Sequence, residues 1–308
     1  MHPSPSDFQL SFATPRKLPK ARDLDGRVAV LDIAFASEAG GTSFEKVTLP
    51  FITGLGARLA AWVDHHDSSH HARYAEDPRF LLRTKAQHGA CPEMITEAVV
   101  EAAGKVDTIV CHGDFDGLAS AAKWMRRGEE SYPGCDADAR AIDTRLGVPS
   151  ATAVRFDRAI RARSRDHALM GLVVRHLATG LSDASLWQLI DEAGAAVVPL
   201  EERARRLAQR YERVGPETVI VDATERDGPY DKTLLLLLGQ ERARTAVVLD
   251  GDSATFAARF DSGINFLTLF GISGGMPTVV SIQRSRLGAA LAKLGVPEGD
   301  VRRLAPAG

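Results

Sequence analysis

Three short apolar segments that alternate with helix-like segments constrain the fold of this chain most strongly. The β-rich segments cover residues 27–35, 60–67 and 106–117, and helix-like segments cover 92–104 and 118–130. Strands and helices of these lengths in this order are typical of an α/β domain built on a parallel sheet. We therefore predict a parallel-sheet α/β domain in the first part of the chain.

Each of the three β-rich segments ends in acidic or imidazole side chains. They are Asp32; Asp64, His65 and His66; and His112, Asp114 and Asp116. Ligands of open α/β sheets bind at the carboxyl ends of the strands, so we expect these side chains to share one crevice. Carboxylate and imidazole donors without a thiolate suit Mn²⁺, with Mg²⁺ or Co²⁺ as alternatives. The set holds more carboxylates than one ion needs, and two metal ions commonly direct water at a phosphate ester.

Each motif also has a simpler interpretation that stays open. The acidic loop could cap the helix at 118–130, with Asp116 as a favourable charge near its N-terminus. Asp32 alone could be a turn residue. The histidine-rich segment could be a solvated loop or a mononuclear zinc site, formed by His65, His66, His70 and His71.

The chain changes character after residue 182. A charge-rich helical segment, broken near Gly194 and Pro199, precedes a new β-rich α/β pattern that begins at 217. We predict four parts, which are an irregular N-terminal arm at 1–26, a catalytic domain at 27–182, a helical connector at 183–214 and a smaller α/β domain at 215–308.

Composition excludes several classes of protein. The formal net charge is -2 and aromatic residues make up 6%, so the chain lacks the charge and the stacking platforms that grip long nucleic acids. Three scattered cysteines do not make a disulfide framework. The longest purely apolar run, Leu234 to Leu238, is far shorter than the ~20 residues of a membrane span. The N-terminus lacks the apolar core of a signal peptide, so we expect a cytoplasmic protein.

Several motifs resemble those of the DHH phosphoesterase superfamily. The sequence VDHHD at 63–67 is similar to the family signature, and CHGDFDGLASAA at 111–122 is similar to the first motif. The sequence RVAVLDIAFAS at 27–37 resembles the second motif. The segment from Glu217 resembles the DHH-associated C-terminal domain, and 258–277 is similar to its substrate-binding end.

The chain departs from the family in three respects. The lone Asp32 and the DHH motif precede the His-x-Asp-x-Asp motif, so the first domain resembles a circularly permuted member. Met276 stands where the family usually has histidine, and Phe115 is bulkier than the usual residue between the two aspartates.

The resemblance implies a role for each residue of the metal centre. His112 and Asp114 would hold a first metal ion, and Asp116 and His65 would hold a second. Asp32 would bridge both ions. The implied cofactor is a pair of Mn²⁺ ions, with Mg²⁺ or Co²⁺ as alternatives.

The resemblance also implies residues around the ions. Asp64 would orient the neighbouring histidines, and His66 would contact the scissile phosphate. The family adds a fourth-motif aspartate on the second ion, for which Asp143 is the candidate because it follows the first-motif helix. Its alternatives are Asp136, Asp138 and Asp107.

A candidate phosphate site lies in the second domain. Arg259 suits bidentate recognition of phosphate, and Gly274 and Gly275 would let backbone amides approach an anion. The alternative is a turn beside a surface arginine.

The resemblance and the composition together predict a metal-dependent phosphodiesterase of short single-stranded oligonucleotides or dinucleotides. Within the superfamily, a RecJ-like single-strand exonuclease and an inorganic pyrophosphatase are alternatives. A non-catalytic module that binds a nucleotide is an alternative of another class. The oligomeric state is not predicted.

Overall fold

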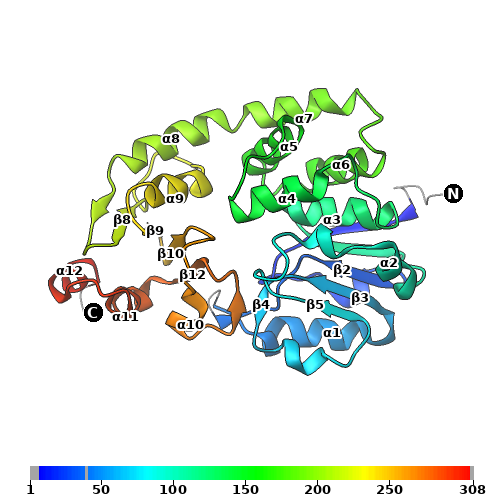
Figure 1. The fold of residues 1–308 in the computed structure, drawn as a ribbon, viewed down its shortest axis with the longest axis horizontal. Helices are drawn as coiled ribbons and strands as arrows, with labels where there is room; N and C mark the ends of the chain where they lie inside the picture. The colour runs from blue at the N-terminus through cyan, green and yellow to red at the C-terminus, as the bar shows by residue number, and fades with distance from the viewer. Residues whose placement is uncertain (1–6, 39–40, 306–308) are drawn as a thin grey trace. The chain divides into compact units, whose positions relative to one another are not determined.

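The computed structural model describes residues 7–38 and 41–305, which fold into two compact units (Figure 1). The first unit contains the chain up to Ala36 together with Ser43–Ala196. The second contains Ser37–Thr42 and the chain from Val197 onward. Among the described residues, no helix combines the length and the apolar character that a bilayer span requires.

The first unit is built on a five-stranded sheet. Its strands lie in the order β1 (Gln9–Ala13), β6 (Thr108–His112), β2 (Val28–Leu31), β3 (Leu59–Asp64) and β5 (Phe80–Leu82). All four neighbouring pairs are parallel. The predicted parallel α/β fold is therefore confirmed, and the three polar strand ends lie on adjacent strands.

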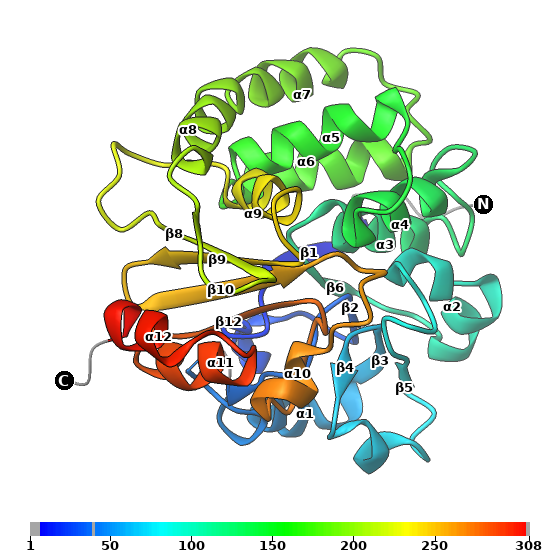
Figure 2. The same ribbon diagram turned by 60° about the vertical axis from the view of Figure 1, so that its left-hand side comes forward.

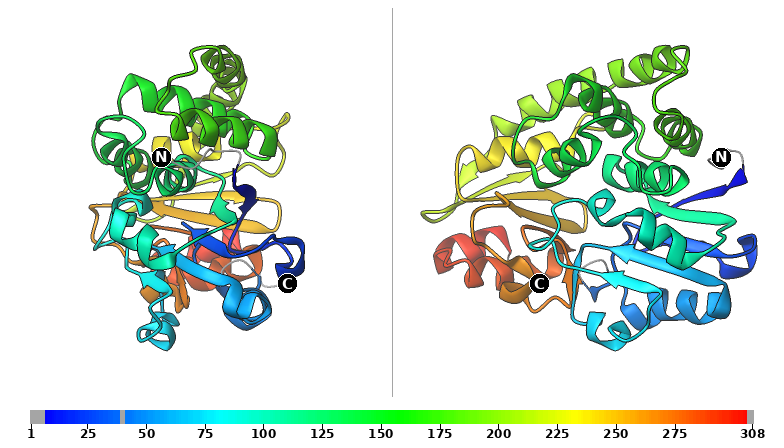
Figure 3. Two further views of the ribbon diagram at one scale, coloured as in Figure 1. Left: turned by 90° about the vertical axis from the view of Figure 1, so that its right-hand side faces the viewer. Right: turned by 45° about the vertical axis from the view of Figure 1, so that its right-hand side comes forward.

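Helices cover both faces of this sheet. They are α1 (Leu49–Leu55), α2 (Glu97–Ala103), α3 (Phe115–Met125), α4 (Cys135–Thr144), α5 (Ala151–Ala162), α6 (His167–Ala178) and α7 (Leu186–Ala195). In Figures 1 and 3, α1 lies on one side of the sheet and α3 to α7 on the other. Alternate residues of β2 face the two cores, Val28 and Val30 toward α1 and Ala29 and Leu31 toward α3. Burial on both faces explains why β2 is apolar throughout.

The second unit is built on a mixed sheet in the order β12 (Val279–Gln283), β10 (Ser253–Ala258), β9 (Thr245–Asp250), β8 (Thr218–Asp222) and β7 (Glu212–Arg213). Only β8 and β9 are parallel within this sheet. One face packs against α8 (Val198–Ala208) and α9 (Lys232–Gln240). The other packs against α10 (Phe266–Phe270), α11 (Leu287–Lys293) and α12 (Glu298–Leu304), as Figure 2 shows. A second α/β domain is thus confirmed.

Short elements complete the chain. They are the two-residue strands β4 (Asp67–Ser68) and β11 (Gly274–Gly275), and the 3-10 or π turns η2 (Ala21–Asp23), η4 (Phe44–Thr48), η5 (Gly56–Arg58), η6 (His71–Tyr74), η7 (Cys91–Met94) and η8 (Arg284–Arg286).

The N-terminal arm is not irregular throughout, which corrects our expectation for 1–26. Residues 1–6 lie outside the described part, but β1 pairs in parallel with β6 at the edge of the sheet. Leu10 and Phe12 pack against the core on the α3 side. Flanking prolines and the short length of this edge strand hid its alternating pattern.

The helix expected at 92–104 is also shorter than predicted. Pro92 lies in the turn η7, and α2 begins after Thr96, whose side chain accepts a hydrogen bond from the backbone N–H of Val99. This N-cap starts the helix five residues late.

Gly117 sets how closely α3 approaches β6, and its replacement should loosen this junction. A Cβ at Gly117 would lie 2.5 Å from the backbone oxygen of His112. Gly117→Ala should therefore lower the free energy of unfolding by about 1–3 kcal/mol, because the helix must shift away from the strand end. Urea denaturation measures this change.

Gly171→Ala is the matched control, because Gly171 lies within α6 and a Cβ there meets nothing within 4 Å. It should leave stability unchanged or raise it by about 0.5–1 kcal/mol. Equal destabilisation by the two substitutions would contradict the proposed packing.

Candidate metal centre

The predicted polar strand ends meet at one edge of the first sheet. Because β6, β2 and β3 are adjacent and parallel, the side chains at their carboxyl ends come together at one edge of the sheet. Three groups of side chains there could hold an ion, and within each group the donor atoms lie within 4.8 Å of one another. The groups are Asp32, His112 and Asp114; His65, Asp116 and Asp143; and Asp32, His65 and His66.

Asp32 stands between these groups. It is buried directly after β2 and has a left-handed backbone (φ 56°), which aspartate tolerates better than most residues. Its backbone N–H donates to the carbonyl of Val63, which fixes the turn against β3. Burial, followed by the charges of Asp116 and Asp114, raises the pKa of Asp32 well above its usual range. The carboxylate therefore needs a cation in order to be charged at low cost.

Group A is formed by Asp32, His112 and Asp114. Asp114 caps α3 by accepting a hydrogen bond from the Gly117 N–H (3.1 Å), and its other oxygen lies 2.7 Å from His112 Nδ1. Burial lowers the pKa of His112, but Asp114 and then Asp32 raise it to about 10. Burial raises the pKa of Asp114, but His112 holds it well below its usual range. The helix cap therefore holds one carboxylate and one imidazole beside Asp32.

Group B is formed by His65, Asp116 and Asp143. His65 Nε2 lies 3.1 Å from an oxygen of Asp116 and 3.1 Å from Oδ1 of Asp32. Asp116 accepts a hydrogen bond from the Cys91 N–H (2.9 Å), and burial raises its pKa to about 6. Asp143 joins the group from α4, the next helix along the chain after α3.

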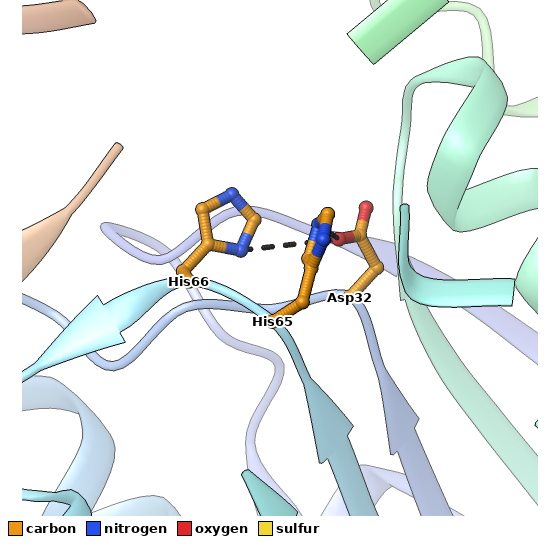
Figure 4. A group of neighbouring side chains, drawn as sticks. All are labelled: Asp32, His65 and His66. Atoms are coloured by element: carbon orange, nitrogen blue, oxygen red, sulfur yellow. Dashed lines mark ion pairs between the residues drawn. The ribbon is translucent and has the colours of Figure 1, made fainter. Parts of the chain in front are cut away.

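His66 and Asp64 form a pair beside Asp32. His66 Nδ1 lies 2.8 Å from Oδ1 of the buried Asp64 and 3.9 Å from Oδ1 of Asp32. Figure 4 shows the rings of His65 and His66 next to Asp32 at the ends of two strands. Burial lowers the pKa of His66 and Asp64 raises it, with a net lowering. Asp64 is thus placed to orient the His66 ring.

Lys85 belongs to this centre, although the sequence did not single it out. It follows β5 and is buried, with Nζ 2.8 Å from His65 Nε2 and in an ion pair with Asp143. Burial lowers the pKa of Lys85, but Asp143 and Asp116 raise it overall. Lys85 could have been found from its position three residues after β5, because β5 is parallel to β3 and ends at the same edge of the sheet.

The alternatives to Asp143 lie apart from these groups. Asp136 pairs with the buried Lys123, and Asp138 accepts hydrogen bonds from Tyr132 and Ser150. Asp107 precedes β6, at the opposite end of that strand from His112. None of the three joins a donor group among the described residues.

The four-histidine zinc site is not formed in the described part of the chain. His70 stacks on Phe44 with ring centroids 4.3 Å apart, and His71 packs edge-on against Phe35. Neither ring enters a donor group among the residues described.

The candidate phosphate residues lie in the second unit. The Arg259 guanidinium makes two hydrogen bonds to the carboxylate of Asp261 (3.0 and 2.9 Å). Gly274 and Gly275 form β11, and Gly275 has φ 128°, which favours glycine. A phosphate would have to compete with Asp261 for Arg259.

The residues at this edge of the sheet fit a divalent cation. Oδ1 of Asp32, the oxygen near His65 and His66, is buried without a hydrogen-bond partner in the described structure, as is Oδ2 of Asp64. Buried acceptors of this kind are rare unless an ion or water satisfies them. Carboxylate and imidazole donors are also those that Mn²⁺, Mg²⁺ and Co²⁺ accept.

Comparison with known proteins gives little further guidance. No family model and no curated protein matches this chain. Among solved structures it is similar to the pGpG-specific phosphodiesterase PggH of Vibrio cholerae, with a TM-score of 0.40 and 13% sequence identity, over 66% of this chain and 82% of that one. A likeness this weak carries no functional conclusion, which therefore has to come from the site itself.

Asp32→Asn should abolish stabilisation by Mn²⁺. An ion that binds only the folded state at 100 times its Kd adds about 2.7 kcal/mol to the wild-type protein, and the variant loses the shared ligand. Without metal, the variant should be more stable than wild type at about pH 8, because it lacks a buried charge.

The sign of the pH effect follows from the raised pKa of Asp32. As the pH rises from the pKa of Asp32 in the unfolded chain toward its higher pKa in the folded protein, the charge on Asp32 lowers the stability of the metal-free wild type. The stability advantage of the variant should therefore shrink at about pH 5. Thermal unfolding with Mn²⁺ or chelator measures both effects. Asp107→Asn, at the opposite end of β6, is the control, and equal stabilisation of Asp32→Asn and wild type by Mn²⁺ would exclude Asp32 as a ligand.

Proposed function

We propose that this protein is a metal-dependent phosphodiesterase that hydrolyses short single-stranded oligonucleotides or dinucleotides. The observation that supports this most is the convergence of Asp32 with two carboxylate–histidine groups at the ends of three adjacent parallel strands. Such a cluster suits hydrolysis of phosphate esters. The motifs further support a DHH phosphoesterase whose first-domain motifs are in permuted order.

In this proposal, group A holds a divalent ion, best Mn²⁺. The bound ion would supply Lewis acidity toward a phosphate oxygen and lower the pKa of water. Asp32 and Asp114 contribute carboxylate oxygens, and His112 contributes a ring nitrogen. Group B offers donors for a second ion, with Asp32 between the two groups as a bridge, but Lys85 contacts His65 and Asp143 there.

His66 is proposed to contact the scissile phosphate. Asp64 accepts a hydrogen bond from His66 Nδ1 and stabilises positive charge on the His66 ring. His66 Nε2 can then donate a hydrogen bond to a phosphate oxygen. Burial lowers the pKa of His66 in the ligand-free protein, whereas an anionic substrate raises it. The substrate thereby favours the charged ring that binds it.

Short substrates suit the charge of the chain better than long ones. Long polymers are gripped by many Lys and Arg contacts to phosphate, and the formal net charge here is -2. Arg259 with Gly274 and Gly275 is proposed to bind a further phosphate or a terminal nucleotide. Because Arg259 is paired with Asp261, a phosphate would bind here by displacing the Asp261 carboxylate from the guanidinium.

A substrate-length series with Mn²⁺ tests the proposed activity. Turnover of two- to five-nucleotide substrates should exceed that of long single strands, duplex DNA should be inert, and chelation should abolish the reaction. Cyclic dinucleotides, 3′,5′-bisphosphonucleosides and pyrophosphate complete the screen.

Other outcomes of this series favour other functions. Rates that rise with length would favour the RecJ-like exonuclease, and pyrophosphate as the best substrate would favour a pyrophosphatase. Binding of a nucleotide without any turnover would indicate a non-catalytic module.

His66→Ala should separate catalysis from metal binding. The variant should keep its stabilisation by Mn²⁺ and lose turnover by about 10²–10³-fold, the usual cost of removing one hydrogen-bond donor to charge that develops in the transition state. His70→Ala, which removes a nearby ring outside the donor groups of the described structure, should keep most activity. Full activity of His66→Ala would remove the assigned role.

A further inference from the structure

The ammonium group of Lys85 is buried in an unusual place. The side chain is 1% exposed, and lysine is almost never buried to this degree without partners. Its partners are His65 and Asp143, two of the three members of group B. The backbone N–H of Lys85 donates to Asp67 (3.2 Å), which ties the start of this side chain to the loop after β3.

The direction of the hydrogen bonds follows from the donors that each group has. An ammonium has three donors and no acceptor, so the Asp143 carboxylate accepts a hydrogen bond from Lys85. His65 Nδ1 lies 3.0 Å from the carbonyl oxygen of His88, which can only accept, so Nδ1 carries the proton. Lys85 Nζ lies 2.8 Å from Nε2 and 3.5 Å from Nδ1, so the ammonium lies against the His65 ring, beside the nitrogen that a metal ion would use.

Charge gives the same result. Group B contains the carboxylates of Asp116 and Asp143, with Asp32 next to them. The lysine charge offsets part of this negative charge from within the protein. A divalent ion in contact with the same donors would have to displace the ammonium, because two cations in contact repel strongly inside a protein.

Group A differs from group B in this respect. The ion pairs of His112 are to Asp114 and Asp32, and the hydrogen bonds of Asp114 are to His112 and to the Gly117 N–H. Among the described residues, no lysine or arginine forms a hydrogen bond or ion pair with His112 or Asp114. These donors are therefore available to an ion without competition from a bound side chain.

We propose that Lys85 takes the place of the second cation in group B, so that the protein binds one divalent ion tightly, at Asp32, His112 and Asp114. The centre is then a hybrid of one metal ion and one ammonium. Lys85 is a positioning residue that fixes His65 and Asp143 and supplies positive charge beside the ion. This inference rests on the proposed function for the ion in group A, and it replaces the expected pair of ions.

The number of Mn²⁺ ions per chain tests this proposal without an activity assay. Equilibrium dialysis with elemental analysis should find one ion in the wild-type protein and two in Lys85→Met, whose side chain has a similar length and no charge. Electron paramagnetic resonance should show an isolated Mn²⁺ in the wild type and a spin-coupled pair in the variant. Lys85→Gln should give the same result if Lys85→Met folds poorly.

Lys123→Met is the matched control. Lys123 is also a buried lysine paired with an aspartate, Asp136, but it lies outside the donor groups. Its replacement should leave one ion per chain. Two ions in the wild type, or one ion in both the wild type and Lys85→Met, would overturn the inference and leave the proposed function standing. No ion in any of these proteins would overturn both.

Discussion

Repulsion between buried carboxylates is the interaction on which the centre of the first unit depends. Asp32 and Asp116 are buried near one another, and burial together with neighbouring negative charge raises the pKa of Asp32. The sheet holds them there because β2 and β3 are locked side by side and α3 starts at the end of β6. Cations among the carboxylates lower the cost of this repulsion. Histidines and Lys85 supply part of this positive charge, and in our proposal a divalent ion in group A supplies the rest.

The parallel sheet and the meeting of the polar strand ends could be predicted from the sequence. The apolar runs that end in Asp32, Asp64 and His112 occupy neighbouring strands, and neighbouring parallel strands end at one edge. The placement of Asp143 rested on the motif resemblance alone, and in the structure its carboxylate lies with His65 and Asp116. The roles of these residues in catalysis stay predictions.

The parts that the sequence did not reveal depend on contacts between distant residues. β1 and β5 are short edge strands with half-buried side chains, so their patterns are weak. Lys85 was missed because its place depends on β5, and because an isolated lysine in a polar segment is normally exposed. The pairing of Arg259 with Asp261 was also not predicted, although it weakens the case for a free phosphate site there.

The position of bound manganese tests the central claim most directly. Crystals grown with Mn²⁺ and measured at the manganese absorption edge would give an anomalous difference map that locates each ion. The account predicts a strong peak in contact with Asp32, His112 and Asp114, next to an ordered Lys85 side chain in group B. A map without a peak at group A, or with its strongest peak elsewhere in the chain, would contradict the assignment of this edge of the sheet as a metal centre.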